Sequence, residues 1–316
     1  MYNANVCYGA NNYIDILYFL SNTTIHPHID RIYFSCDSLV DKPEETLFSE
    51  LEDNDYKCKY GRWVELGTYD RIKRYCSRVT GIEVSILYKR ISTCRMYPCM
   101  MVIVDNPNKK TVDWFDAICN SLGLAPSLSH VELTMDFTPY EYGLYEFLWR
   151  HLFLKFHRGN SCFVGSEFGS FYIGHKRKNS KSVILYQKPL DGINVLRLEF
   201  RLNKAYIRKL DVELDCFEKI NDINLPDLIS FKQINRDELL KHLMWKNKSR
   251  LLKFDDIDKD LLIGQLGHFP NAYGGVANEI AYMKKIPYIN NCQRFLEDMP
   301  EANEALLGRL RNLKFI

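Results

Sequence analysis

Two short segments of the sequence carry acidic side chains in a pattern that suits a metal ion. Both alternate apolar and polar residues, as strands with one buried face do. In the segment 130–137 the polar positions are His130, Glu132, Thr134 and Asp136. In the segment 195–202 they are Arg197, Glu199 and Arg201. If the two strands are neighbours, their carboxylates lie about 5 Å apart and can share a cation such as Mg²⁺ or Mn²⁺.

Spacing limits which acids can share one ion. Glu132 and Asp136 are four residues apart, so their Cα atoms lie about 13 Å apart on an extended strand. We therefore expect Glu199 and one of these two acids to bind the metal, with the other acid behind it. His130 or Thr134 would supply a further ligand.

A metal held in this way would polarise a phosphodiester and let a hydroxyl attack it. Tyr suits this role, because a phosphotyrosine ester conserves energy for resealing. Tyr206 lies seven residues after Glu199, on a predicted helix that would carry it back over the polar face. Tyr186 lies on a predicted strand with Lys188 on the same face. We predict Tyr206 as the nucleophile and Tyr186 as the alternative, with Lys188 or Arg197 offsetting charge in the transition state.

Positive charge is concentrated around these candidates. Thirteen Lys or Arg residues lie between positions 150 and 209 against three acids, a local net charge of +10 in a chain whose total is +2. Interleaved with aromatic residues, such a block can follow a phosphate backbone, although a solvated basic surface gives the same pattern. The residues expected to bind DNA phosphates are Lys176, Arg177, Lys178, Lys181, Lys188, Arg197 and Arg201.

Other chemistries have weaker support. His26-Pro27-His28 imitates a histidine-hydrophobic-histidine metal motif, but Pro removes a ladder hydrogen bond and argues against a buried strand. The ten Cys are scattered, and Cys94 and Cys99 lack the second pair that a zinc site needs. The sequence contains no Gly-rich phosphate loop followed by Lys and Ser or Thr, which excludes a Walker-type motor.

The secondary structure predicted around these residues indicates an α+β fold. Hydrophobic periodicity predicts an antiparallel sheet backed by helices. The predicted strands are 31–36, 81–89, 97–104, 130–137, 170–175, 183–188 and 195–202. The predicted helices are 13–20, 111–122, 142–156, one capped by Asn203 that runs through Leu210, 236–245, 276–285 and 303–313, with an acidic exposed loop at 41–55.

Length and composition allow two ordinary domains or one large one: 316 residues, of which 46% are hydrophobic. We predict an N-terminal α+β region at 1–125 that contributes to the sheet, a catalytic core at 126–216 and a helical C-terminal module at 217–316. No apolar run is long enough to cross a membrane, and the start of the chain lacks a signal-peptide pattern, so we expect a cytoplasmic protein that does not bind membranes.

Four motifs in this order, spread over about 75 residues, resemble the plasmid and phage replication initiation factors of the Rep_trans family, which also includes some conjugative relaxases. Residues 130–136 resemble its R-I-D-L-A-x-D strand, and residues 172–180 its Y-I-G-S-R-K-S segment. Residues 183–188 resemble R-I-Y-D-K, and residues 195–202 resemble V-R-x-E-x-x-L. The sequence departs from the family pattern at three positions, where His130 replaces Arg and Glu132 and Gln187 each replace Asp.

The resemblance implies a site-specific nickase and strand transferase that starts rolling-circle replication. Such an enzyme cuts single-stranded or hairpin origin DNA with a metal-assisted Tyr and stays attached to the 5′ end. The family's nucleophile follows its V-R-x-E strand, which points to Tyr206. A host helicase is the expected partner. The resemblance leaves open whether the chain forms a homodimer. The alternatives are a conjugative relaxase of the same family and a non-catalytic nucleic-acid-binding protein on this scaffold.

Overall fold

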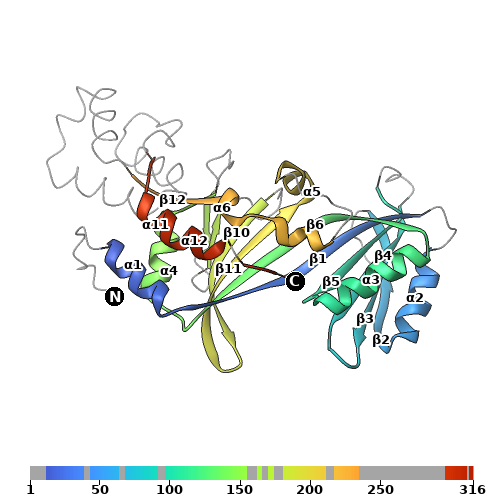
Figure 1. Cartoon of the computed structure of the whole chain (residues 1–316). Coiled ribbons are helices and arrows are strands. Elements are labelled where there is room, and N and C mark those ends of the chain that lie inside the picture. Colours follow the sequence, from blue (N-terminus) through green and yellow to red (C-terminus); the bar gives the residue numbers. More distant parts are fainter. Residues whose placement is uncertain are drawn as a thin grey trace.

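The computed structural model describes residues 12–38, 43–63, 68–91, 97–154, 162–165, 170–173, 181–210, 217–234, 296–311 and 313–315. Its centre is a ten-stranded sheet with the strand order β2-β3-β4-β5-β1-β6-β11-β10-β9-β8 (Figure 1). All neighbouring strands whose register is defined are antiparallel. The predicted α+β class and antiparallel sheet are therefore confirmed.

Five strands form each half of this sheet. The first half contains β1 (Thr24–Ser38), β2 (Tyr56–Trp63), β3 (Tyr69–Ser77), β4 (Glu83–Arg90) and β5 (Met100–Asp105). The second half contains β6 (Leu124–Thr138), β8 (Cys162–Gly165), β9 (Ser170–Ile173), β10 (Lys181–Leu190) and β11 (Ile193–Asn203).

Helices connect and flank these strands. Helix α1 (Asn12–Ser21) precedes β1, α2 (Pro43–Asp53) follows it, and α3 (Lys109–Ser121) follows β5. Helix α4 (Tyr142–His151) follows β6, and α5 (Lys204–Ile207) with the 3₁₀ turn η2 (Arg208–Leu210) follows β11. A smaller sheet contains β7 (Leu152–Leu154), β12 (Ile229–Ile234) and β13 (Leu296–Asp298). The remaining short elements are η3 (Phe217–Asp222), α6 (Leu225–Leu228), α11 (Pro300–Ala302), the π-helix η5 (Asn303–Leu307) and α12 (Gly308–Leu310).

The two halves of the large sheet repeat one order of elements. The first runs β1-α2-β2-β3-β4-β5-α3, and the second runs β6-α4-β8-β9-β10-β11-α5, with β7 added after α4. Strands β1 and β6 lie at the centre of the sheet. Outward from β1 the order is β5, β4, β3, β2, and outward from β6 it is β11, β10, β9, β8, so in each half the last strand of the chain order lies next to the first. An approximate twofold axis between β1 and β6 therefore relates the halves.

The main core lies on one face of the sheet. Helices α2 and α3 cover that face of the first half (Figure 1), where Phe115 of α3 stacks on Phe34 of β1 at 4.8 Å between ring centroids. In β6 the alternate residues Val131, Leu133 and Met135 are fully buried in the same core. We call the opposite face of the sheet, which points away from α2 and α3, the far face.

Several predicted elements are confirmed and others are corrected. The strands expected around 130–137, 183–188 and 195–202 are present, and Asn203 caps α5 by accepting the Tyr206 N–H at 3.1 Å. The prediction of an exposed loop at 41–55 is wrong. This stretch contains helix α2, because Leu47 and Leu51 lie one turn apart and are buried. Strands β2 and β3 were not predicted.

The predicted three regions share one hydrophobic core. Strand β6 begins at Leu124, and the core cluster includes Ile32, Phe200 and Leu306, one residue from each region. In the described part of 217–316, the strands β12 and β13 accompany the short helices. The helices expected at 236–245 and 276–285 lie outside the described residues. No described helix is long and apolar enough to cross a membrane.

Candidate active site

The two acidic segments lie side by side at the centre of the sheet. Strands β6 and β11 pair so that Arg197 lies opposite Asp136, Glu199 opposite Thr134, and Arg201 opposite Glu132. The polar side chains of both strands therefore share the far face, and each Arg faces a carboxylate. The condition set from the sequence, that these two strands are neighbours, is met.

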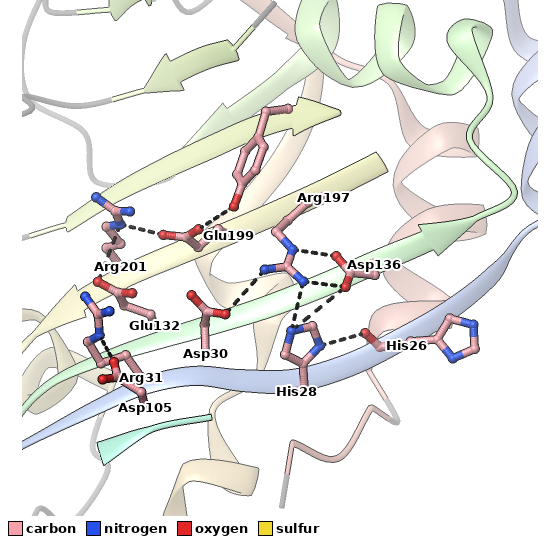
Figure 2. A network of polar contacts seen from close by, with 11 residues as sticks. His26, His28, Asp30, Arg31, Asp105, Glu132, Asp136, Arg197, Glu199 and Arg201 are labelled. Carbon is pink, nitrogen blue, oxygen red and sulfur yellow. Dashed lines mark hydrogen bonds and ion pairs between the residues drawn. The ribbon is translucent and has the colours of Figure 1, made fainter. Parts of the chain in front are cut away.

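Asp136 is held by a buried arginine. Arg197 donates to both of its carboxylate oxygens, through Nε at 2.7 Å and Nη2 at 2.6 Å, and both side chains are almost completely buried. Arg197 also contacts Asp30 Oδ1 at 3.3 Å and His28 Nε2 at 3.3 Å (Figure 2). Both oxygens of Asp136 are thus engaged by Arg197, and burial does not suit Arg197 to the predicted phosphate contact.

Glu199 and Glu132 converge on Arg201. Its Nε lies 2.5 Å from Glu199 Oε1 and 3.6 Å from Glu132 Oε1 (Figure 2). The two carboxylate oxygens therefore lie no further apart than the sum of these distances, and both acids face the position that the Arg201 guanidinium occupies. His130 Nε2 lies 3.4 Å from Glu132 Oε1. Arg201 is committed to these acids, although it is partly exposed.

The second oxygen of Glu199 accepts a hydrogen bond from Tyr186. The Tyr186 hydroxyl on β10 lies 3.2 Å from Glu199 Oε2, and the ring is partly exposed. Burial raises the pKa of Tyr186 above its ordinary value, and the Glu199 carboxylate raises it further, while Arg197 acts in the opposite direction. The phenol is therefore protonated at neutral pH and has a base in contact with it.

Tyr206, the predicted nucleophile, lies elsewhere. Its side chain is 3% exposed and belongs to the hydrophobic core, where burial raises its pKa to about 12. The short helix α5 carries it into the core instead of over the polar face. This position favours Tyr186 over Tyr206 as the attacking residue.

A buried hydroxyl at the centre of this cluster has no hydrogen-bond partner. Thr134 Oγ1 is fully buried, opposite Glu199 in register, and unsatisfied, which calls for an explanation. Within the described ranges, no three His, Cys, Asp or Glu side chains form a metal site. Mg²⁺, however, commonly uses one or two carboxylates and completes its shell with water and phosphate oxygens. Glu132 and Glu199, with the Thr134 hydroxyl, fit that donor set.

The His26-Pro27-His28 segment is part of β1, but His26 is exposed and Pro27 and His28 are partly exposed, which agrees with the expectation that Pro argues against a buried strand. Pro27 pairs only with Met135 of β6, because β5 reaches no further along β1 than Arg31. Pro27 thus lies where β1 has a strand on one side only, a position that tolerates a missing N–H. Burial lowers the pKa of His28 below its ordinary value, Asp136 opposes this, and Arg197 adds to it.

The remaining predicted phosphate ligands have separate outcomes. Lys176, Arg177 and Lys178 lie outside the described residues, and of Lys181 the structure describes only the strand position. Lys188 is partly exposed on β10, two residues beyond Tyr186 on the same face.

The structure adds residues that sequence reasoning missed. Asp30 reaches Arg197 from a bulge between Ile29 and Arg31 of β1, and Arg31 pairs with Asp105 and donates to the Tyr33 hydroxyl at 3.4 Å. Alternation predicted a strand at 31–36, but a bulge changes which residues share a face, and no spacing in the sequence reveals it.

Comparisons with known proteins give no family for this chain: a scan against family models finds no match, and a search of curated proteins finds no similar sequence.

Proposed function

We propose that the chain is a metal-assisted, tyrosine-dependent DNA strand transferase that nicks and reseals DNA at a replication origin. The observation that carries the proposal is the hydrogen bond from Tyr186 to Glu199 on a sheet face lined with acids and arginines. A nucleophile in contact with a base that is itself held by a third group is the pattern of nucleophilic catalysis.

In this mechanism Tyr186 attacks the phosphorus of a DNA phosphodiester. Its phenolic proton passes to Glu199 Oε2, the oxygen that already accepts its hydrogen bond. Arg201 holds the other oxygen of Glu199 and so fixes the direction of the base. The bond that forms joins the Tyr186 oxygen to the 5′ phosphate, and the 3′ oxygen leaves and takes a proton from water. The reverse attack by that 3′ hydroxyl reseals the strand.

Glu132 and Glu199 would hold Mg²⁺ or Mn²⁺, with the Thr134 hydroxyl and His130 beside them. The ion would supply polarisation of the phosphodiester and stabilise charge on its oxygens. Asp136 and Arg197 act as positioning residues, since their bidentate contact holds β6 and β11 in register beside the reacting groups.

The resemblance of four motifs to replication initiation factors supports a biological role for this reaction. It places the reaction in rolling-circle replication of a plasmid or phage, with hairpin origin DNA as substrate and a host helicase as partner. The helical C-terminal module predicted for 217–316 would contact duplex DNA or that partner. A conjugative relaxase would use the same chemistry.

The test is a covalent adduct on a denaturing gel. Full-length protein is incubated with 3′-labelled single-stranded and hairpin DNA pools and Mn²⁺, because the protein stays on the labelled 3′ fragment. We expect an adduct in wild type and Tyr206→Phe, none in Tyr186→Phe or with EDTA, and a loss of about 100-fold or more in Glu199→Gln.

Other outcomes discriminate between the alternatives. Loss of the adduct in Tyr206→Phe alone, in a variant that unfolds at the same urea concentration as wild type, moves the nucleophile to Tyr206. Salt-dependent DNA binding without an adduct on any substrate overturns the enzyme and leaves the non-catalytic binding protein.

A further inference from the structure

The twofold relation between the halves of the sheet identifies positions equivalent to the active site. Strands β1 and β6 align as Ile32-Tyr33-Phe34-Ser35-Cys36-Asp37 with Val131-Glu132-Leu133-Thr134-Met135-Asp136. Ser35 thus corresponds to Thr134, and Asp37 to Asp136. The helix after each half is capped by an Asn: Asn108 accepts the Thr111 N–H at 3.0 Å, as Asn203 accepts that of Tyr206 at 3.1 Å. The two Asn share this role, while the register places Asp105 at the position of Asn203.

The catalytic acid and its arginine are absent from the first half. Register places Met101 opposite Ser35, as Glu199 lies opposite Thr134, and Ile103 opposite Tyr33, as Arg201 lies opposite Glu132. Met101 and Ile103 pack with the buried Ile72, Leu87 and Tyr69 and with the partly buried Tyr60 in a cluster separate from the main core. We call Tyr60, Ile72, Leu87, Met101 and Ile103 the far-face patch.

The far-face patch lies on the same sheet face as the active site. Its residues alternate with Phe34, Tyr75 and Tyr88, which face the helices α2 and α3. Strands β5, β1, β6 and β11 are consecutive hydrogen-bonded neighbours, so no element separates the patch from the Glu199 cluster in the plane of the sheet. Three strand spacings put β5 about 14 Å from β11. Met101 and Glu199 are also displaced along the strands by about 23 Å, because Ser35 pairs with Ser127 whereas Thr134 pairs with His28.

Cations border the patch. The Arg74 guanidinium lies 5.4 Å from the centre of the Tyr60 ring and donates to Ser85 at 3.1 Å. Lys59 and Arg31 lie nearby on β2 and β1, and the two acids that pair with these three cations are Glu83 and Asp105. Tyr60, Met101 and Ile103 are the partly exposed members of the patch. Apolar and aromatic side chains bordered by a surplus of cations suit the bases and phosphates of single-stranded nucleic acid.

We propose that the far-face patch binds the unpaired bases of the DNA strand whose phosphodiester reaches Tyr186. This inference rests on the proposed function, because continuity with that site identifies the occupant. The first half of the sheet is then a binding platform and the second half the catalytic one.

The test measures binding without chemistry. Full-length Tyr186→Phe, which cannot form the adduct, binds a 3′-labelled single-stranded oligonucleotide, and fluorescence anisotropy gives the dissociation constant. Adding Met101→Glu is expected to weaken binding about tenfold or more, while Met101→Leu restores it. The matched control is Val79→Glu in the β3–β4 turn, an exposed apolar position that receives the same charge and should leave binding unchanged.

A second readout keeps the proposal testable if Met101→Glu does not fold. DNA with 5-iodouracil at single positions on either side of the nick is irradiated with the Tyr186→Phe protein, and mass spectrometry locates the cross-links. We expect a cross-linked peptide that contains Tyr60.

The outcomes separate the two proposals. Weaker binding with Met101→Glu, in a protein whose wild type forms no adduct, overturns the proposed function and retains the patch. An adduct in wild type with equal affinity in all variants and no cross-link at Tyr60 overturns the patch. A change from dimer to monomer in Met101→Glu with unchanged DNA affinity assigns the patch to a second copy of the chain and also overturns it.

Discussion

The two halves of the sheet share a backbone plan but differ in what they bury on the far face. At equivalent positions, the first half has Met101 where the second has Glu199, and Ile103 where the second has Arg201. Apolar side chains at these positions are stabilised by packing against one another, whereas buried charged groups require ion-pair or hydrogen-bond partners. The second half therefore carries a network of arginines and acids, and the first carries a small apolar cluster.

Both halves have an Asp at the equivalent position of the central strand, but its surroundings differ. Asp37 is exposed and accepts the Cys99 backbone N–H at 3.2 Å. Its equivalent, Asp136, is 3% exposed and takes two hydrogen bonds from Arg197. The carboxylate is common to both halves, but only in the second has burial made it dependent on one charged partner.

Removing these two equivalent acids should give the largest difference between the halves. Asp136→Ala leaves Arg197 buried without the carboxylate that accepts two of its hydrogen bonds, and we expect the free energy of unfolding to fall by about 3–5 kcal/mol. Asp37→Ala removes one exposed hydrogen bond and should cost about 1 kcal/mol or less. Urea unfolding followed by circular dichroism measures both.

The double variant Asp136→Leu, Arg197→Met is the control for that comparison. It removes both charges and should recover part of the loss, since no uncompensated charge stays buried. Equal effects of Asp136→Ala and Asp37→Ala would contradict the different burial of the two acids.

The sequence predicted the strands of the site better than their partners. Alternation identified 130–137 and 195–202, because both have one face in the core. That Arg197 belongs to Asp136, and Arg201 to Glu199 and Glu132, depends on the register between strands about 60 residues apart, which local periodicity does not contain. The choice of Tyr206 required knowing on which side of the sheet α5 lies, and a four-residue helix has too short a pattern to indicate it.

The repeat itself was missed for a similar reason. Only the segments around Ser35 and Thr134 align visibly, while the outer strands share topology and register but little sequence. The acidic stretch before β2 concealed α2, because its three apolar residues are diluted by charges that face solvent. A bulge and a shared core are three-dimensional facts, and residue types alone do not specify them.

The equivalent helix caps offer a sharper test of the repeat, with a smaller effect. Asn108→Ala and Asn203→Ala each remove one side-chain acceptor from a helix N-terminus, and we expect each to cost about 1 kcal/mol. Asn→Asp at either position should retain most of the stability, since Asp caps as well as Asn. A cost confined to one of the two caps in urea unfolding would break the proposed equivalence.

The smallest effect concerns pH and the equivalent pair Tyr33 and Glu132. Burial raises the pKa of Glu132, but the His130 hydrogen bond and the nearby Arg201 outweigh burial, so the pKa lies below its ordinary value. The folded state therefore binds this proton less readily than the unfolded chain. Glu132 contributes stability above its unfolded pKa of 4.5, and the contribution is lost as pH falls through the lower folded pKa. Tyr33 carries no charge in that range, because the ordinary pKa of a Tyr is 10.0 and burial raises the pKa of Tyr33 above it.

Glu132→Gln should therefore flatten the acid side of the stability profile. Between about pH 5 and about pH 3, the free energy of unfolding of the variant should fall less than that of wild type. Glu301→Gln, which changes an exposed residue of α11, is the matched control and should follow wild type. Tyr33→Phe, the corresponding change in the first half, should leave the slope unaltered. A slope in Glu132→Gln equal to that of wild type would mean that His130 and Arg201 do not stabilise this carboxylate. The two halves would then differ in side-chain packing but not in the electrostatic stabilisation of Glu132.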